Sequence, residues 1–166
     1  MGHDGDLGNP SGVIEMKDVY YFLDAVRVLQ SFPGFSGEEA SGLKGWFERY
    51  LVWLTESEQG RSEAAARNNH GIYYDLQVLS IASFLDDLEA ISESLIRAEA
   101  RLTAHFDEKG VQVEELTRTQ TAHYCAFNLQ GWLNFATVAE KHGSQIAGHR
   151  LLRSGVNWLL AHAGQA

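Results

Sequence analysis

The sequence has little that would interrupt a helix and nothing that would support a disulfide framework. Its 166 residues include only two prolines, Pro10 and Pro33, and a single cysteine, Cys125. An intrachain disulfide and a zinc site built from several cysteines are therefore excluded. Cys125 stands in an apolar helical pattern, so we expect a small buried thiol and not a nucleophile.

Long hydrophobic runs and basic clusters are lacking as well. No segment approaches the roughly 18 to 20 apolar residues that cross a bilayer, and the first six residues lack the basic and apolar regions of a signal peptide. The sequence has 13 Lys and Arg residues and 22 Asp and Glu residues, so its formal charge is -9. We therefore expect neither a nucleic-acid partner nor a membrane partner. A phosphate-binding loop and the Gly-x-Ser-x-Gly elbow of hydrolases are absent too.

What the sequence does contain is apolar residues that recur at intervals of three and four, which predicts an all-α fold. Residues 1–13 are rich in Gly and Asp and are expected to form a flexible N-terminal segment, and residues 14–166 are expected to form one helical domain. A polar loop is expected at 57–63. We expect an array of antiparallel helical hairpins with helices at about 17–30, 37–54, 69–85, 88–106, 119–141 and 144–163.

Two runs carry more polar chemistry than a core needs, and they suggest one shared site. The first extends from Arg67 to Gln77 and the second from Glu114 to Leu129. On the helix of the first run, His70, Tyr74 and Gln77 fall at i, i+4 and i+7 and therefore share a face.

Each of these residues also has a structural interpretation. A single His or Tyr on a helix is more often part of the packing than a catalyst. Asn69 would serve equally as a helix N-cap, and Arg118 would pair with Glu114 or Glu115. Their joint appearance is what favours a functional site.

Four motifs together resemble the alginate lyase superfamily of helical polysaccharide lyases. They are Asn68-Asn69-His70-Gly71, Tyr74-Asp75-x-Gln77, Glu115-Leu116-x-Arg118-Thr119 and His123-Tyr124-x-x-x-Asn128-Leu129. The resemblance implies an incomplete α/α toroid, of which this chain is only a part because the family has roughly twice as many helices. It also implies a lyase that cleaves an anionic polysaccharide of the alginate or glucuronan type by β-elimination, in the periplasm or after secretion, with no cofactor.

The resemblance further assigns roles to individual residues. Asn69 and Arg118 would neutralise the uronate carboxylate, and His70 and Tyr124 would act as base and acid, in an order set by syn or anti elimination. The positions implied for substrate binding are Asn68, Tyr74, Gln77 and His123. This mechanism requires no metal, and no His-x-x-x-His or Cys-x-x-Cys spacing occurs.

Two alternatives remain on the residues alone. One is a helical carbohydrate-binding or scaffold protein that keeps the framework without turnover. The other is a protein-interaction module in which the polar stripes contact a partner and no sugar.

Overall fold

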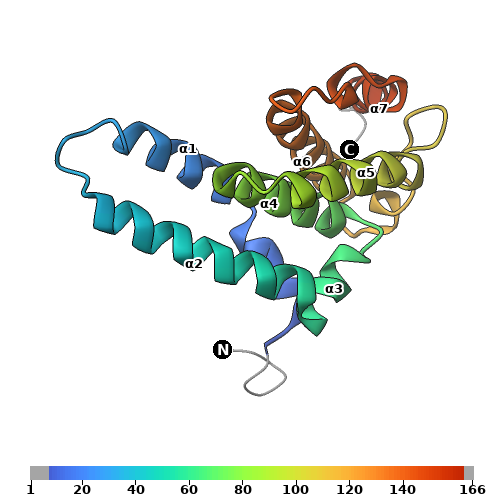
Figure 1. Cartoon of the computed structure of the whole chain (residues 1–166). Helices are drawn as coiled ribbons and strands as arrows, with labels where there is room; N and C mark the ends of the chain where they lie inside the picture. Colours follow the sequence, from blue (N-terminus) through green and yellow to red (C-terminus); the bar gives the residue numbers. More distant parts are fainter. Residues whose placement is uncertain (1–7, 163–166) are drawn as a thin grey trace.

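The computed structural model describes residues 8–162, so residues 1–7 of the expected flexible segment lie outside the described residues (Figure 1). The described residues form seven α-helices and no strand, which confirms the expected all-α class. The elements are η2 (Pro10–Met16), α1 (Val19–Leu29), α2 (Gly37–Glu56), α3 (Glu58–Ala64), α4 (Asn69–Leu85), α5 (Leu88–His105), η3 (Glu115–Thr117), α6 (Thr121–Glu140), η4 (Ile146–Gly148) and α7 (Arg150–His162).

Local signals in the sequence set several of these boundaries. At the start of α2, the Ser36 hydroxyl accepts from the Glu39 N–H at 3.1 Å and the Glu39 carboxylate accepts from the Ser36 N–H at 2.9 Å. This reciprocal capping box satisfies two of the free donors of the first turn. Asp86 ends α4 in the left-handed conformation at φ 60°, and Asp87 then caps α5 by accepting from Ala90 N–H at 3.1 Å.

Helix α4 lies at the centre of the molecule, with α1, α2, α3, α5 and α6 packed around it (Figure 1). Every residue from 71 to 82 is buried, polar side chains included. A helix enclosed on all sides shows no single apolar stripe, unlike a surface helix. The largest buried side chains around it include Trp132, Phe135 and Phe47.

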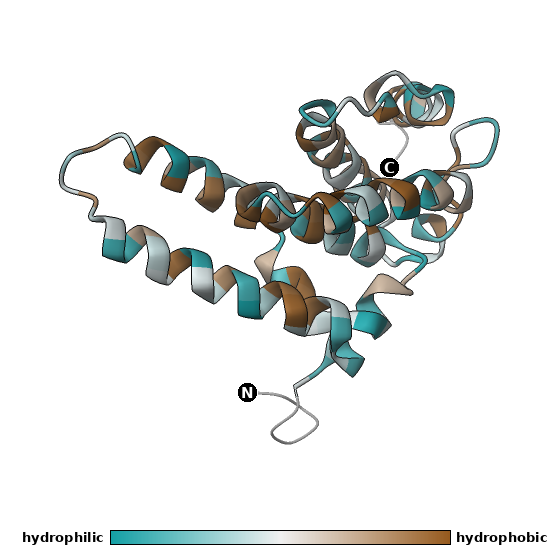
Figure 2. Cartoon of the chain, in the orientation of Figure 1, coloured by the Kyte–Doolittle hydropathy of each residue, from teal (hydrophilic) through white to brown (hydrophobic). Residues whose placement is uncertain are grey.

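The α1–α2 hairpin extends away from the rest of the molecule, and its connection lies at the far end in Figure 1. Hydrophobic and hydrophilic residues alternate along α2, as is typical of a helix with one packed and one open side (Figure 2). Along α2 the rings of Trp46, Tyr50 and Trp53 form a stacked row with centroids 5.2 and 5.6 Å apart.

Two of the sequence-based expectations were wrong in detail. The segment expected to be a polar loop contains α3, a seven-residue helix capped by the Ser57 hydroxyl, which accepts from the Gly60 N–H at 3.0 Å. The helix expected over 144–163 begins only at Arg150, after η4. Within residues 8–162, no helix combines the length and the apolar character needed to span a membrane.

Candidate active site

The turn between α3 and α4 presents the first polar run. Asn68 is the N-cap of α4, and its Oδ1 accepts from the His70 N–H at 3.2 Å. The structure therefore gives Asn68 the capping role that the sequence had left open for Asn69. Asn69 is the first residue of α4 and is 1% exposed, while the His70 side chain is 21% exposed.

The buried Arg101 of α5 holds the turn between α3 and α4 in place. The Arg101 guanidinium donates to the Ala64 carbonyl at 2.7 Å and to the Ala66 carbonyl at 2.5 Å, and its Nε donates to Asp75 Oδ2 at 2.6 Å. Asp75 is fully buried and also accepts from Arg97 Nε at 2.5 Å. A carboxylate shared by two guanidinium groups satisfies the charge that burial would otherwise make costly. Asp75 therefore ties α4 to α5 and to the turn that carries the site.

Gly71 is needed for this arrangement because the Arg101 guanidinium passes over it. A Cβ at position 71 would lie 1.9 Å from Arg101 Nη1 and 2.4 Å from the Ala66 carbonyl oxygen. Both distances are far shorter than a van der Waals contact. The Gly of the Asn-Asn-His-Gly motif is thus explained by packing.

Glu115 of η3 joins the two polar runs. Its Oε1 accepts from the Asn69 backbone N–H at 2.6 Å, and the Asn69 Nδ2 lies 3.1 Å from Oε1 and 3.0 Å from Oε2. Glu115 is 1% exposed. Because hydrogen bonds to a buried carboxylate are strong, this contact holds η3 against the start of α4.

The charges around Glu115 show which other groups lie near it. Burial raises the pKa of the Glu115 carboxyl above its usual range, and the two hydrogen-bond donors of Asn69 oppose that rise. The charge of the Arg118 guanidinium lowers the Glu115 pKa as well, as does the His70 imidazole when it is protonated. Asn69 is therefore the residue of the three that is hydrogen-bonded to Glu115, and Arg118 and His70 act on it only electrostatically.

Arg118 also connects this centre to α6. Its guanidinium carbon lies 4.0 Å from the centroid of the Tyr124 ring, which is a cation–π contact. Both residues are half-buried, so each retains a surface open to solvent. Glu115 thus holds the segment that ends at Arg118 against Asn69, and the stack joins Arg118 to Tyr124.

His123 is exposed on α6 beside the same stack. Its ring centroid lies 5.3 Å from that of Tyr124 and 6.0 Å from that of Phe127, to which it is parallel. His123 therefore faces solvent at the edge of the site, where a bound polymer could reach it.

Tyr74 and Gln77 do not lie on the surface of the site. They share a face of α4 with His70, as expected, but α2 and η2 cover that face beyond the first turn. The Tyr74 hydroxyl donates to the Leu54 carbonyl at 3.3 Å, and Gln77 Nε2 donates to the Val13 carbonyl at 3.0 Å. Tyr74 is 2% exposed and Gln77 is not exposed, so this burial disagrees with their predicted contact with substrate.

Sequence reasoning missed three groups that organise the site. These are Glu115, which was considered only as an ion-pair partner, Arg101, and Glu63 of α3, whose Oε1 lies 2.6 Å from His70 Nδ1. Glu63 is 4% exposed. In the sequence each of them is only a charged residue, and charged residues are usually solvent-exposed, so there was no reason in the sequence to place these three in the interior.

A second buried polar cluster lies beneath α6. The Asn128 Nδ2 donates to Gln112 Oε1 at 2.8 Å, and the Trp132 indole N–H donates to His105 Nδ1 at 3.1 Å. Burial and the nearby Arg101 charge lower the pKa of His105 to about 3, so its imidazole is neutral at neutral pH. Asn128 is 1% exposed and hydrogen-bonded to Gln112, so it stabilises the interior of the protein, although it belongs to the motif that contains His123 and Tyr124.

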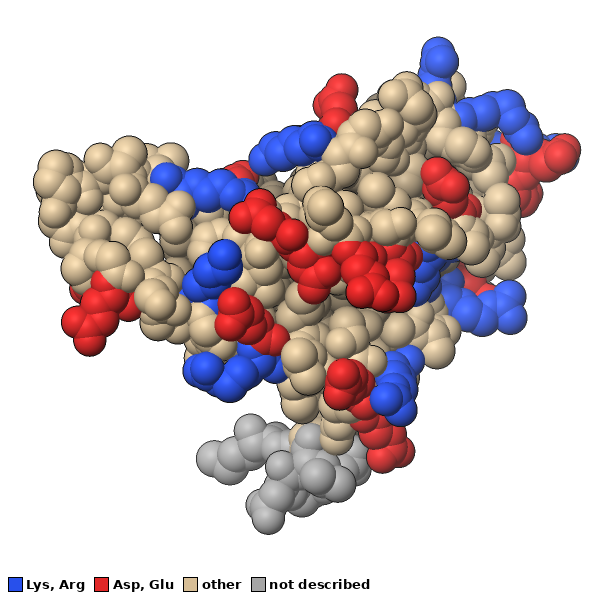
Figure 3. Space-filling model, in the orientation of Figure 1, with Lys and Arg blue, Asp and Glu red and all other residues tan. Residues whose placement is uncertain are grey.

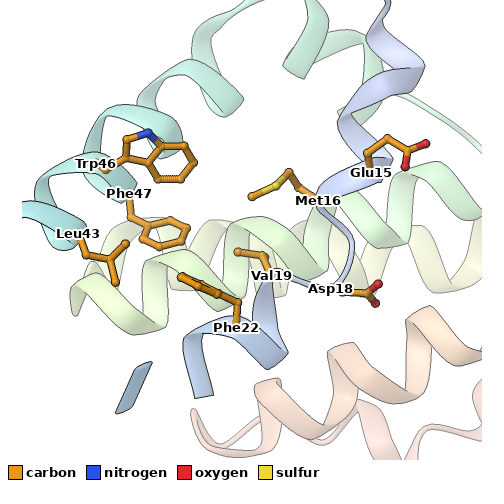
Figure 4. A pocket seen from close by; sticks show the side chains of 8 residues that line it. All are labelled: Glu15, Met16, Asp18, Val19, Phe22, Leu43, Trp46 and Phe47. Atoms are coloured by element: carbon orange, nitrogen blue, oxygen red, sulfur yellow. The ribbon is translucent and has the colours of Figure 1, made fainter. Parts of the chain in front are cut away.

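An apolar hollow lies elsewhere, between η2, α1 and α2 (Figure 4). It has a volume of about 550 Å³ and an apolar wall. Its only charged side chains are the carboxylates of Glu15 and Asp18, which would repel a polyanion. It is lined by Glu15, Met16, Asp18, Val19, Phe22, Leu43, Trp46 and Phe47.

Acidic side chains also gather across the middle of the face shown in Figure 3. A polyanionic ligand would therefore need a local positive centre. Arg118 is the guanidinium that the site supplies. Among the described residues, no three His, Cys, Asp or Glu side chains are grouped to hold a metal ion.

Comparison with known proteins places this arrangement in a class. The family model described as alginate lyase matches residues 1–165. The chain therefore belongs to the alginate lyase family.

Among solved structures, that of an alginate lyase from Bacteroides ovatus is similar, with a TM-score of 0.87 and 26% sequence identity. The match covers 96% of this chain and 43% of that one, so the chain spans less than half the length of the protein it matches. The expected toroid-like helical fold agrees with this likeness. No curated protein matches the sequence.

Proposed function

We propose that the protein is a polysaccharide lyase that cleaves a polyuronate of the alginate or glucuronan type by β-elimination. The observation that carries the proposal is the contact between Asn69 and Glu115, which joins the segment that carries His70 to the segment that carries Arg118, with Arg118 stacked on Tyr124. Membership of the alginate lyase family supports it. A polyuronate substrate and the family also support a place of action in the periplasm or outside the cell.

The chemistry explains the choice of residues. In β-elimination a base takes the proton on C5 of the uronate, the C4–O bond breaks, and a C4=C5 double bond forms. The departing oxygen receives a proton from an acid. Since C5 is next to a carboxylate, its proton becomes acidic only when the charge of that carboxylate is neutralised.

Accessibility assigns neutralisation first to Arg118. Its half-buried guanidinium can donate two parallel hydrogen bonds to a carboxylate. Asn69 is 1% exposed and its amide donates to Glu115, which disagrees with its predicted contact with the uronate carboxylate, so we propose that it holds η3 and thereby positions Arg118.

His70 and Tyr124 then act as the base that takes the C5 proton and the acid that protonates the departing oxygen. His70 stands at the first turn of α4 and Tyr124 at the first turn of α6, both with part of the ring open to solvent. The substrate epimer decides which of them takes the C5 proton, because syn and anti elimination place the acid and the base differently. Asn68 and His123 are proposed to contact the flanking sugars.

The test is the ultraviolet absorbance of the unsaturated product, measured while the purified chain is incubated with polymannuronate, polyguluronate or glucuronan. We expect a rise with one of these polymers that His70→Ala and Tyr124→Phe each reduce by about 100-fold or more. Tyr21→Phe is the matched control because Tyr21 is 63% exposed on α1. No rise in a folded chain would contradict turnover by this chain.

One second candidate is a carbohydrate-binding unit without turnover, because the half-buried Arg118 stacked on Tyr124 would serve to bind a uronate even without catalysis. Titration calorimetry with the same polymers distinguishes the two functions. Heat of binding that Arg118→Gln abolishes, with no change in absorbance, would replace the lyase proposal with the binding one.

A further inference from the structure

Glu63 stands behind the proposed catalytic histidine. Its Oε1 lies 2.6 Å from His70 Nδ1, and Glu63 is 4% exposed while the His70 side chain is 21% exposed. An ionised carboxylate only accepts hydrogen bonds, so the proton of this contact belongs to Nδ1. In the neutral imidazole the other ring nitrogen, Nε2, then carries no proton.

The surrounding backbone holds Glu63 in place before any ligand binds. Gly60 allows the close turn from α2 into α3, since a Cβ there would lie 1.8 Å from the Leu54 carbonyl oxygen. On the other side, Arg101 donates to the Ala64 and Ala66 carbonyls. Glu63 therefore sits on a short helix that is fixed at both ends.

From this geometry we propose that Glu63 is a positioning residue that holds His70 in the Nδ1–H tautomer and presents Nε2 as the atom that exchanges a proton. The inference rests on the proposed function only in naming that exchange. The pairing itself follows from the contact, because a partner on one ring nitrogen decides which nitrogen keeps the proton.

The tautomer can be observed without any turnover. Long-range ¹H–¹⁵N spectra of the uniformly labelled chain, recorded at a pH where the imidazole is neutral, distinguish a protonated Nδ1 from a protonated Nε2. His70→Gln identifies the signals of His70. We expect Nδ1–H in the wild-type chain, and a wild-type signal from Nε2–H would overturn the proposal.

Two variants of Glu63 then separate positioning from packing. Glu63→Gln keeps an oxygen that accepts from Nδ1–H and should preserve the tautomer, whereas Glu63→Leu removes the acceptor and should shift His70 towards Nε2–H. Glu58→Leu, on the exposed side of the same helix, is the matched control and should leave the His70 spectrum unchanged. An unchanged spectrum in a folded Glu63→Leu variant would overturn the proposal. If that variant does not fold, the wild-type and Glu63→Gln spectra still decide it.

Kinetics adds a readout that distinguishes this inference from the proposed function. With an active polyuronate substrate, Glu63→Leu should lower kcat by about tenfold or more while KM changes by less than about threefold, and Glu63→Gln should recover part of the loss. A wild-type chain with the Nδ1–H tautomer and no activity on any polyuronate would support the pairing and contradict the lyase. An active chain whose His70 carries its proton on Nε2 would support the lyase proposal and contradict the role of Glu63.

Discussion

Asn69 and Glu115 are 46 residues apart in the sequence, yet the backbone N–H and the amide of Asn69 both donate to the carboxylate of Glu115. The shortest of these contacts is 2.6 Å, and both residues are 1% exposed. The contact joins the start of α4 to η3, which leads directly to Arg118. It therefore brings together two polar runs that the chain keeps far apart.

Removal of the Glu115 carboxylate should destabilise the fold. In Glu115→Ala two buried donors of Asn69 lose their acceptor, so we expect the free energy of unfolding in urea to fall by about 3 kcal/mol. Glu115→Gln should cost less, because the Asn69 Oδ1 is buried without a partner and can accept from the new amide after a flip. The neighbouring Glu114 forms only an exposed ion pair with Arg67, so Glu114→Ala should cost less than about 0.5 kcal/mol. Equal losses at the two positions would contradict the role of Glu115.

Gly71 provides a second stability test. A methyl group there would meet Arg101 and the Ala66 carbonyl, so Gly71→Ala should destabilise the protein by about 2 to 3 kcal/mol. Gly42 lies within α2, and a methyl group at that position would have no atom within 4 Å, so Gly42→Ala should instead stabilise the protein by about 0.5 to 1 kcal/mol. Thermal unfolding of both variants measures the difference. A shift in the same direction for both would show that Arg101 does not fix the turn.

The sequence predicted α1, α2, α4, α5 and α6 to within a few residues, because their apolar spacing and capping residues are local signals. It did not predict α3. That helix has seven residues, most of them polar, and it buries Glu63 where it packs against η2 and α4, with His70 as the partner of the carboxylate. Contacts of this kind depend on tertiary structure and produce no periodic pattern of apolar residues in the sequence.

The same limit explains the outcome for the site residues. His70, Tyr74 and Gln77 do share a face of α4, as helical spacing requires. Spacing alone does not tell which side of a helix is covered, and α4 is enclosed along most of its length. Tyr74 and Gln77 are consequently core residues, while Arg118, at the end of η3, and Tyr124, in the first turn of α6, have an open surface.

The buried His105 should make stability depend on pH. Its pKa is lowered to about 3 from an ordinary value of 6.5. Between these values the unfolded chain binds a proton that the folded chain does not, so stability should fall as the pH decreases from about 6.5 towards 3. At pH 4.5 this loss amounts to up to about 3 kcal/mol.

Replacing His105 isolates this contribution from that of the other titrating groups. His105→Gln keeps an acceptor for the Trp132 N–H but has no proton to bind in this range. Urea unfolding of both chains at pH 7.0 and at pH 4.5 should show the smaller loss in the variant. Parallel losses would mean that His105 is protonated in the folded chain.

Arg118 provides the sharpest test of the proposed chemistry. Its guanidinium is held by the Tyr124 ring at 4.0 Å and lies near Glu115, so its position is fixed before a uronate binds. Arg118→Gln removes the charge that neutralises the carboxylate, and kcat/KM should fall by about 100-fold or more. Arg118→Lys keeps the charge but loses the two-pronged contact and the stacking, so it should recover only part of that loss. Arg153→Gln, on the exposed side of α7, removes the same charge from a residue outside the site and should change kcat/KM by less than about threefold. If Arg118→Gln and Arg153→Gln behaved alike on the active polymer, neutralisation would have to be assigned to another group.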